Sequence, residues 1–129
     1  MSYFLGIDTS NYTTSVALYD DKTNEIKSLK KLLPVKSGEK GIRQSDAVFH
    51  HTVQLPDLIE NLFNDFNGEI KAIGVSVKPC NEDSSYMPCF LTGISVARSL
   101  ANALNVPLYN FSHQDGHIVA ALYSADKID

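Results

Sequence analysis

The sequence predicts an α/β fold in which one mixed sheet of five strands is flanked by helices. Two observations support this prediction. The first third of the chain carries short alternating runs separated by polar turns, whereas later apolar residues recur every three or four positions between short β-branched or aromatic runs. With 129 residues, the chain is long enough for one compact core and too short for two ordinary domains. We therefore expect a single domain over residues 1–129.

Three strands are expected at the start of the chain. Residues 3–7 form a short apolar run, and residues 13–19 alternate Thr, Ser, Ala and Tyr with Thr, Val and Leu. Residues 25–33 alternate enough for a third strand. Polar turns separate these runs, the second of them at residues 20–24. The opening is therefore predicted to be an antiparallel meander.

A first helix is expected after a loop. It would start from a cap at Ser45 or Asp46 and run towards residues 67–68, with a kink before Pro56. Its apolar stripe would consist of Leu58, Ile59, Leu62, Phe63 and Phe66.

The later elements alternate strand and helix. They are a strand at residues 71–77, a polar loop at residues 78–88, a helix with apolar residues at 94, 97, 101 and 104 that ends near Asn105, a strand at residues 108–111 and a helix capped by Ser112. A meander followed by right-handed strand–helix–strand crossovers builds the mixed sheet of a ribonuclease-H-like lobe.

The composition is that of an ordinary soluble protein. The chain is 43% hydrophobic and 20% charged, with a net charge of −4 and no basic stripe, so we do not expect it to bind nucleic acid unaided. Its first residues have neither a basic start nor a long apolar run, which excludes a signal peptide or membrane span there and predicts a cytoplasmic location. Cys80 and Cys89 match no common zinc or redox spacing and are expected to be free thiols.

Two histidines near the end of the chain are candidate metal ligands. His113 and His117 are four residues apart at the start of the expected last helix, a spacing that places both imidazoles on one face. Two protein ligands rarely complete a site, so the remaining ligands would have to come from elsewhere. A pair of capping or surface histidines is the alternative interpretation.

Five segments, in this order, resemble the glycoprotease family. They are Gly6-Ile7-Asp8-Thr9-Ser10, Thr14-Ser15-Val16-Ala17, His50 before Pro56-Asp57-Leu58-Ile59, Gly93-Ile94-Ser95-Val96-Ala97 and His113-Gln114-Asp115-Gly116-His117. Members of this family were once called O-sialoglycoprotein endopeptidases and are now understood as tRNA threonylcarbamoyladenosine transferases. They have two lobes, in the manner of actin, sugar kinases and heat-shock ATPases. This chain resembles only the N-terminal lobe, so a second lobe is expected to be absent from it.

The resemblance implies a site shared between the two lobes. His113 and His117 would bind a divalent metal (zinc, iron or magnesium), completed by an acid of the second lobe and by phosphate oxygens of ATP or an adenylate. Asp8, Thr9, Ser10 and Thr13 would face the phosphates, and Asp8 could hold a metal-bound water. The alternative is a plain hairpin whose polar side chains satisfy their own turn. His50 is assigned either to helix packing or to the cleft.

The chain departs from the family pattern in two places. Residues 11–13 replace the acidic residues that usually follow the first Thr-Ser, and residues 78–88 replace a Gly-Pro-Gly turn. Such departures are typical of a divergent paralogous branch. Lys78 and Tyr86 could supply new substrate contacts from the replacement loop, although a solvated loop with a buried tyrosine is an equally supported interpretation.

The leading functional hypothesis is the N-terminal lobe of a threonylcarbamoyladenosine-transferase-like protein. By resemblance, its partners would be the second lobe, other subunits of a tRNA-modification complex and, indirectly, tRNA. The isolated lobe would be inactive and could form a homodimer through its uncovered surface. The alternative hypothesis is a catalytically silent scaffold subunit, and a kinase or ATPase of the same fold is a weaker one. Metallopeptidase activity is disfavoured because Gln114 stands where a zinc peptidase has its general base.

Overall fold

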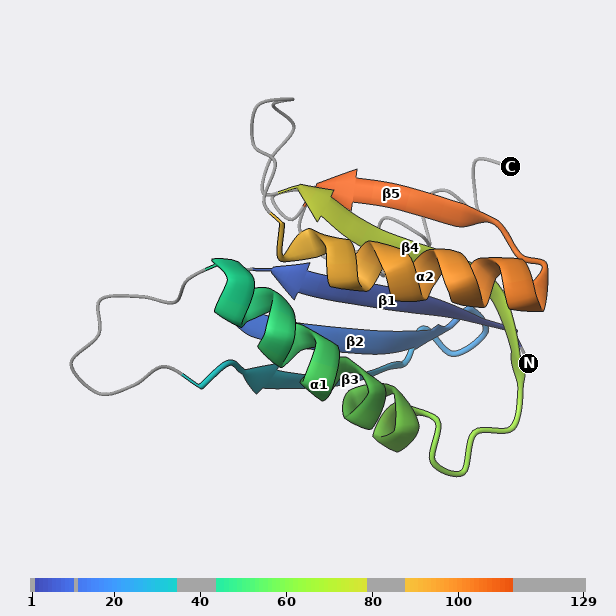
Figure 1. Ribbon diagram of the computed structural model, residues 1–129. Helices are drawn as coiled ribbons and strands as arrows, with labels where there is room; N and C mark the ends of the chain where they lie inside the picture. The colour runs from blue at the N-terminus through green and yellow to red at the C-terminus, as the bar shows by residue number, and fades with distance from the viewer. Residues whose placement is uncertain (1, 11, 35–43, 79–87, 113–129) are drawn as a thin grey trace.

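The computed structural model describes residues 2–10, 12–34, 44–78 and 88–112. Figure 1 shows that these residues form a sheet with two helices packed on it. The strands are β1 (Ser2–Ser10), β2 (Thr13–Asp20), β3 (Ile26–Leu32), β4 (Glu69–Lys78) and β5 (Leu108–Ser112), and the helices are α1 (Gln44–Leu62) and α2 (Phe90–Leu104). The last helix predicted from the sequence lies outside the described residues.

The five strands form one mixed sheet in the order β3-β2-β1-β4-β5. Strand β2 pairs antiparallel with β1 and β3, whereas β4 pairs parallel with β1 and β5. Parallel neighbours need a crossover connection, which the chain makes through α1 before β4 and through α2 before β5. The predicted five-stranded α/β arrangement is therefore confirmed for the described residues.

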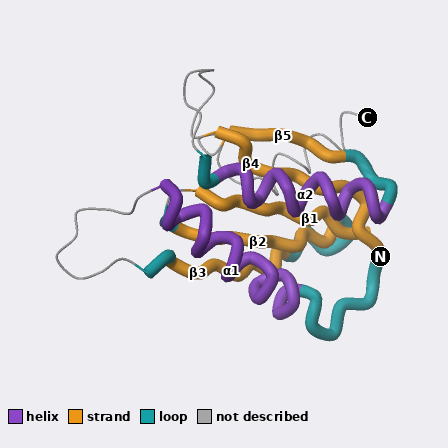
Figure 2. The backbone as a smooth tube through the Cα atoms, in the orientation of Figure 1, coloured by secondary structure: helices purple, strands orange, loops and turns teal. Residues whose placement is uncertain are grey.

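Both helices cover the same face of the sheet (Figures 1 and 2). The side chains beneath them are nearly all apolar, and burying each large one contributes about 1.5–3 kcal/mol. This core contains Leu5, Ile7, Val16, Leu18, Ile73 and Val75 from the strands, Leu55, Leu58 and Leu62 from α1, and Ala97 and Ala101 from α2. Alternate residues of each strand therefore point to the core, and the residues between them point to the opposite face.

The opposite face of the sheet has an apolar cluster of its own. Phe4 and Tyr19 stack with ring centroids 6.0 Å apart, and Ala72 packs beside them. Tyr109 and Phe111 of β5 extend the cluster towards the edge of the sheet. None of the described helices is long and apolar enough to cross a membrane. The cytoplasmic location stays a prediction.

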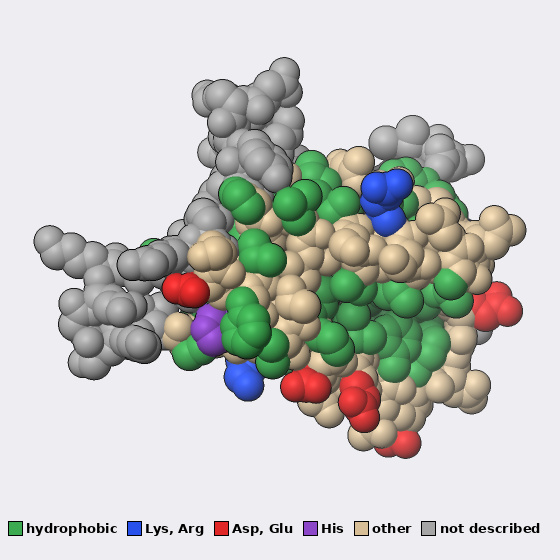
Figure 3. Space-filling model, viewed as in Figure 1, with side chains coloured by type: hydrophobic (Ala, Val, Ile, Leu, Met, Phe, Trp, Pro, Cys, Tyr) green, Lys and Arg blue, Asp and Glu red, His purple; other side chains and the backbone are tan. Residues whose placement is uncertain are grey.

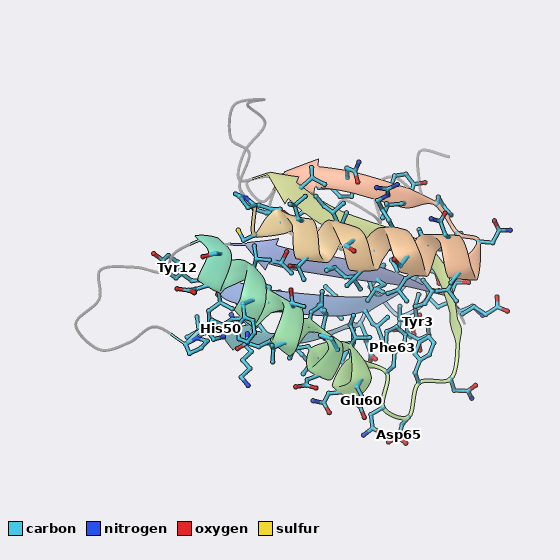
Figure 4. The ribbon with its side chains drawn as sticks, viewed as in Figure 1. Tyr3, Tyr12, His50, Glu60, Phe63 and Asp65 are labelled. Carbon is cyan, nitrogen blue, oxygen red and sulfur yellow. The ribbon has the colours of Figure 1, made fainter. Side chains whose placement is uncertain are left out.

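Helix α1 ends earlier than the apolar spacing predicts. It stops at Leu62, and Phe63 and Phe66 follow it in a loop where Asp65 has a φ of 63°. The Phe66 ring meets the rings of Phe63 and Tyr3 edge to face, with the ring centroids 4.9 Å apart in each case. Figure 4 shows Tyr3 and Phe63 close to each other. The predicted stripe was therefore wrong in its last two members, because residues in a loop that packs on the same core follow the same spacing.

Helix α1 begins before the cap that the sequence predicts at Ser45 or Asp46. The helix begins at Gln44, so Ser45 and Asp46 lie within its first turn, where an acidic side chain suits the helix dipole. Pro56 lies inside the 19-residue helix and does not end it. Such a shift at a helix end is common because end residues satisfy helix criteria only in part.

Buried polar contacts tie α1 to the sheet. Nδ1 of His51 lies 2.8 Å from Oγ1 of Thr14, and Nε2 of Gln54 donates to the same hydroxyl oxygen at 3.1 Å. His51 and Thr14 are fully buried, so these contacts form where water cannot compete. They fix the rotation of α1 over β2.

Helix α2 packs unusually closely on β1. A Cβ atom built on Gly93 would lie 2.9 Å from Oγ1 of Thr9 and 3.3 Å from Cγ2 of Ile7. Only glycine therefore allows the first turns of α2 to lie this near the strand. The helix ends at Leu104, where Asn105 adopts the left-handed conformation with a φ of 56°, close to the end that the sequence predicts.

The substitution Gly93→Ala tests this close approach. The added methyl group overpacks the contact with Thr9, which should cost about 1–3 kcal/mol. Alanine brings a gain of about 1 kcal/mol to a helix, so we expect the free energy of unfolding to fall by up to about 2 kcal/mol. Urea unfolding of Gly93→Ala, Thr9→Ala and the double variant would measure it. The double variant should lose less stability than the two single losses combined, and strictly additive losses would contradict the proposed contact.

Candidate functional site

The carboxyl ends of the three parallel strands meet at one edge of the sheet. Figure 1 shows the arrowheads of β1, β4 and β5 at the same end, next to the first turn of α2. Ligands of open α/β sheets bind outside the carboxyl ends of the strands, where loops and helix starts converge. This edge is therefore the candidate site.

Asp8 and Ser76 directly follow the last pair of the neighbouring strands β1 and β4 at this edge, which places them next to each other. Ile7 of β1 pairs with Val75 of β4, so the next residue of each strand points to the face away from the helices. Ser76 is fully buried, and no group in the described part of the chain forms a hydrogen bond with its Oγ atom. An unsatisfied buried hydroxyl costs about 1–3 kcal/mol, so its presence needs a reason such as a ligand or an ordered water.

The end of the β1–β2 hairpin places further predicted residues here. Asp8 pairs with Ser15, and Ser10 pairs with Thr13, across the two antiparallel strands. Asp8 and Thr13 are partly exposed. The hairpin therefore brings the backbones of Asp8, Ser10 and Thr13 to this edge, and these are residues for which we predicted a phosphate-facing role.

Thr9 has a structural role that the sequence did not reveal. Its hydroxyl donates a hydrogen bond to the carbonyl of Cys89 at 2.9 Å and accepts one from the amide of Gly93 at 3.1 Å. Cys89 itself makes no side-chain capping bond to α2, so Thr9 satisfies an amide of the first helical turn from the neighbouring strand. Because its fully buried hydroxyl is occupied in this way, any contact of Thr9 with phosphate would come from its backbone.

Cys89 is a free thiol buried where α2 begins, as the sequence predicts. Burial raises the pKa of this thiol, and the negative charge of Asp8 raises it further. The thiol is therefore held in its neutral form, which disfavours a role as a nucleophile or metal ligand. Cys80 lies outside the described residues.

Of the residues predicted for the substrate loop and the histidine pair, only Lys78 is among the described residues. Lys78 is the last residue of β4, so its backbone reaches the candidate edge, whereas Tyr86, His113 and His117 lie outside the described residues. Ser112 is the last residue of β5, so the chain enters the histidine segment directly from this edge. Within the described ranges, no three His, Cys, Asp or Glu side chains are grouped to hold a metal ion.

His50 does not reach the sheet. It projects from the first half of α1, partly exposed, with its ring 5.2 Å from that of Phe49 (Figure 4). The neighbouring residue His51 makes the buried contact with the sheet. Sequence reasoning missed this role, and also the roles of Ser76 and Gly93, because adjacent histidines and single small residues give no signal of which one faces the sheet.

Comparisons with known proteins agree with this architecture. A family model for tRNA N6-adenosine threonylcarbamoyltransferase matches residues 24–128. The protein of that name from Campylobacter fetus is 35% identical over 116 residues, which are 88% of this chain and 33% of the relative. The one from Carboxydothermus hydrogenoformans is 34% identical over 118 residues, 90% of this chain and 34% of the relative. Among solved structures, YeaZ from Pseudomonas aeruginosa aligns with a TM-score of 0.60 and 23% identity, over 87% of this chain and 44% of YeaZ.

The described residues form an α/β lobe with a mixed five-stranded sheet, and its fold is similar to that of YeaZ. The chain belongs to the tRNA N6-adenosine threonylcarbamoyltransferase family. It spans about a third of the length of the curated relatives it matches. The family resemblance predicted from the sequence is thus confirmed.

The raised pKa of Cys89 predicts how stability depends on pH. A raised pKa in the folded state means that the thiol stabilises the fold below the unfolded value near 9.0 and that this contribution is lost as the pH rises through the folded pKa. We expect stability to decline above about pH 9, and to decline less in Cys89→Ala. Urea unfolding between pH 7 and 10, with Cys80→Ser in both proteins, would measure the difference. If the free energy of unfolding falls equally with pH in the two proteins, the predicted contribution of the Cys89 thiol is contradicted.

Proposed function

We propose that this chain forms the N-terminal lobe of a tRNA-modifying threonylcarbamoyltransferase and that its carboxyl strand edge provides one side of a site for a nucleotide and a metal. The observation that carries this proposal is the juxtaposition of Asp8 with the unsatisfied hydroxyl of Ser76 at an edge from which β5 leads directly to His113. Family membership supports the choice of reaction.

The described residues suit such a ligand. Asp8 offers a carboxylate for a hydrated cation, and Ser76 offers a hydroxyl to a ligand oxygen or water. Amides at the end of the β1–β2 hairpin could donate to phosphate oxygens. His113 and His117 would provide imidazole ligands, and a metal held there would polarise the carbonyl under attack.

A silent scaffold is the second candidate function. Residues 11–13 lack the acidic side chains expected there, and the hydroxyl of Thr9 is used inside the fold. Both features are compatible with a lobe that keeps its architecture while losing catalysis. The two candidates differ in whether the lobe supports transfer when a second lobe is present.

A chimera can separate these functions. This chain would replace the matching third of the Campylobacter fetus relative, and incorporation of labelled threonine into tRNA would be measured in an extract lacking that relative. We expect transfer, and expect His113→Ala or His117→Ala to reduce it by more than the roughly 10- to 100-fold loss typical of an outer-shell partner. Calorimetry with zinc, iron or magnesium plus ATP should show a matching loss of binding. Ser99→Ala on the exposed side of α2 is the control, and a folded but inactive chimera would favour the scaffold.

The hydroxyl of Ser76 provides an independent test. If it is reserved for a ligand, Ser76→Ala should leave the free energy of unfolding of the free chain unchanged or raise it by about 1 kcal/mol, because an unsatisfied buried group is removed. The same substitution should weaken nucleotide binding by the chimera. Urea unfolding and calorimetry would measure the two effects, with the exposed Ser28→Ala as control. A clear loss of stability would show instead that the hydroxyl has a structural partner.

A further inference from the structure

Positive charge is concentrated in one segment of the chain. Residues 22–43 hold seven of the eleven Lys and Arg residues but only two of the fifteen acidic ones, which gives a net charge of +5 there and −9 elsewhere. The net charge of −4 for the whole chain hides this separation. Association with a polyanion depends on the local field of such a segment as well as on net charge.

The described part of this segment is an exposed edge strand. Strand β3 is the first in the sheet order, and six of its seven residues are exposed. Lys27, Lys30 and Lys31 lie on it. Leu29 packs against the core beneath the helices, so strand alternation places Lys30 on the opposite side and Lys27 and Lys31 on the helix side.

The three lysines are not equivalent. Nζ of Lys27 donates to the carbonyl of Leu62 at 3.1 Å, so this lysine caps the end of α1. Lys31 borders a groove that also contains Asp57 and Glu60 of α1. Lys30 and Lys31 are exposed and make no ion pair within the described ranges. These two ammonium groups are therefore available to an external anion.

The face that bears the helices is an unfavourable surface for a polyanion. Figure 3 shows hydrophobic and neutral side chains over most of it, with several acidic groups and few basic ones. This face therefore offers a polyanion less positive charge than β3, which carries Lys27, Lys30 and Lys31.

Lysines on an edge strand have a second explanation, because they prevent pairing with other strands. That protection needs charges only within the strand. The basic residues Lys22, Lys36, Lys40 and Arg43 lie outside β3, so the bias extends beyond the pairing edge. Edge protection alone does not account for this distribution.

We propose that the β3 edge binds the phosphate backbone of tRNA through Lys30 and Lys31. This inference rests on the proposed function for the choice of tRNA as the polyanion. Lysine contacts to phosphate carry no base specificity, so the edge positions the tRNA while other parts of the enzyme select the adenosine. The chain then contributes to substrate binding as well as to the site at the strand ends.

The test compares two charge-matched double variants in the chimera and in the 129-residue chain. Lys30→Gln/Lys31→Gln removes the proposed contacts and spares the capping Lys27, and Lys71→Gln/Arg98→Gln removes two exposed charges elsewhere. Fluorescence anisotropy with labelled tRNA would give the binding constant between about 50 and 200 mM salt. We expect the first variant alone to lower the salt slope by about 1.5, since each phosphate contact contributes about 0.7–0.9. The ratio of its tRNA affinity at about 50 mM salt to that at about 200 mM salt should then be about eightfold smaller than the same ratio for the parent.

The outcomes separate the inference from the proposed function. Equal tRNA binding by both double variants would overturn the phosphate contacts, whether or not the chimera transfers threonylcarbamoyl groups. Self-association of Lys30→Gln/Lys31→Gln with unchanged tRNA binding would also overturn them and would identify the lysines as edge protection. A selective loss of tRNA binding in an inactive chimera would support the inference while the proposed transfer reaction fails.

Discussion

The fold depends on two threonines that face each other across the β1–β2 hairpin. Thr9 and Thr14 are a cross-strand pair, and both are fully buried beneath the helices. The Thr9 hydroxyl holds the first turn of α2, whereas the Thr14 hydroxyl holds α1 through His51 and Gln54. Each hydroxyl is satisfied in a place without water, where losing a partner costs more than at the surface. One hairpin therefore sets the position of both helices.

Neighbouring residues of β1 therefore have different roles: Thr9 positions a helix, and Asp8 faces the candidate site. Because side chains alternate along a strand, Thr9 points to the helices while Asp8 points to the other face. The same alternation on β4 puts Val75 in the core and Ser76 beside Asp8. The candidate site thus lies directly behind the contacts that position the helices. Movement of α2 relative to β1 would disturb both.

The sequence predicted the sheet and most element limits, because strand alternation and helical spacing report burial directly. It did not predict where α1 ends, since Phe63 and Phe66 pack on the core from a loop at the same spacing. It also did not show that His51 contacts the sheet or that Thr9 caps α2. These contacts join residues 37 and 80 positions apart, a separation that local patterns do not encode. The whole-chain charge likewise concealed the basic segment that contains β3.

The position of β1 in the sheet register matters both for the packing of α2 and for the orientation of Asp8. A slip of β1 by one residue would turn Asp8 towards the start of α2 and Thr9 away from it. The buried amide of Gly93 would then lose its acceptor, and the Asp8 carboxylate would lie near the closely packed first turn. Such a slip leaves buried polar groups unsatisfied and is therefore strongly disfavoured. The bonds that Thr9 makes to α2 consequently keep Asp8 beside Ser76, so the contact that completes the core also orients the groups we assign to the ligand.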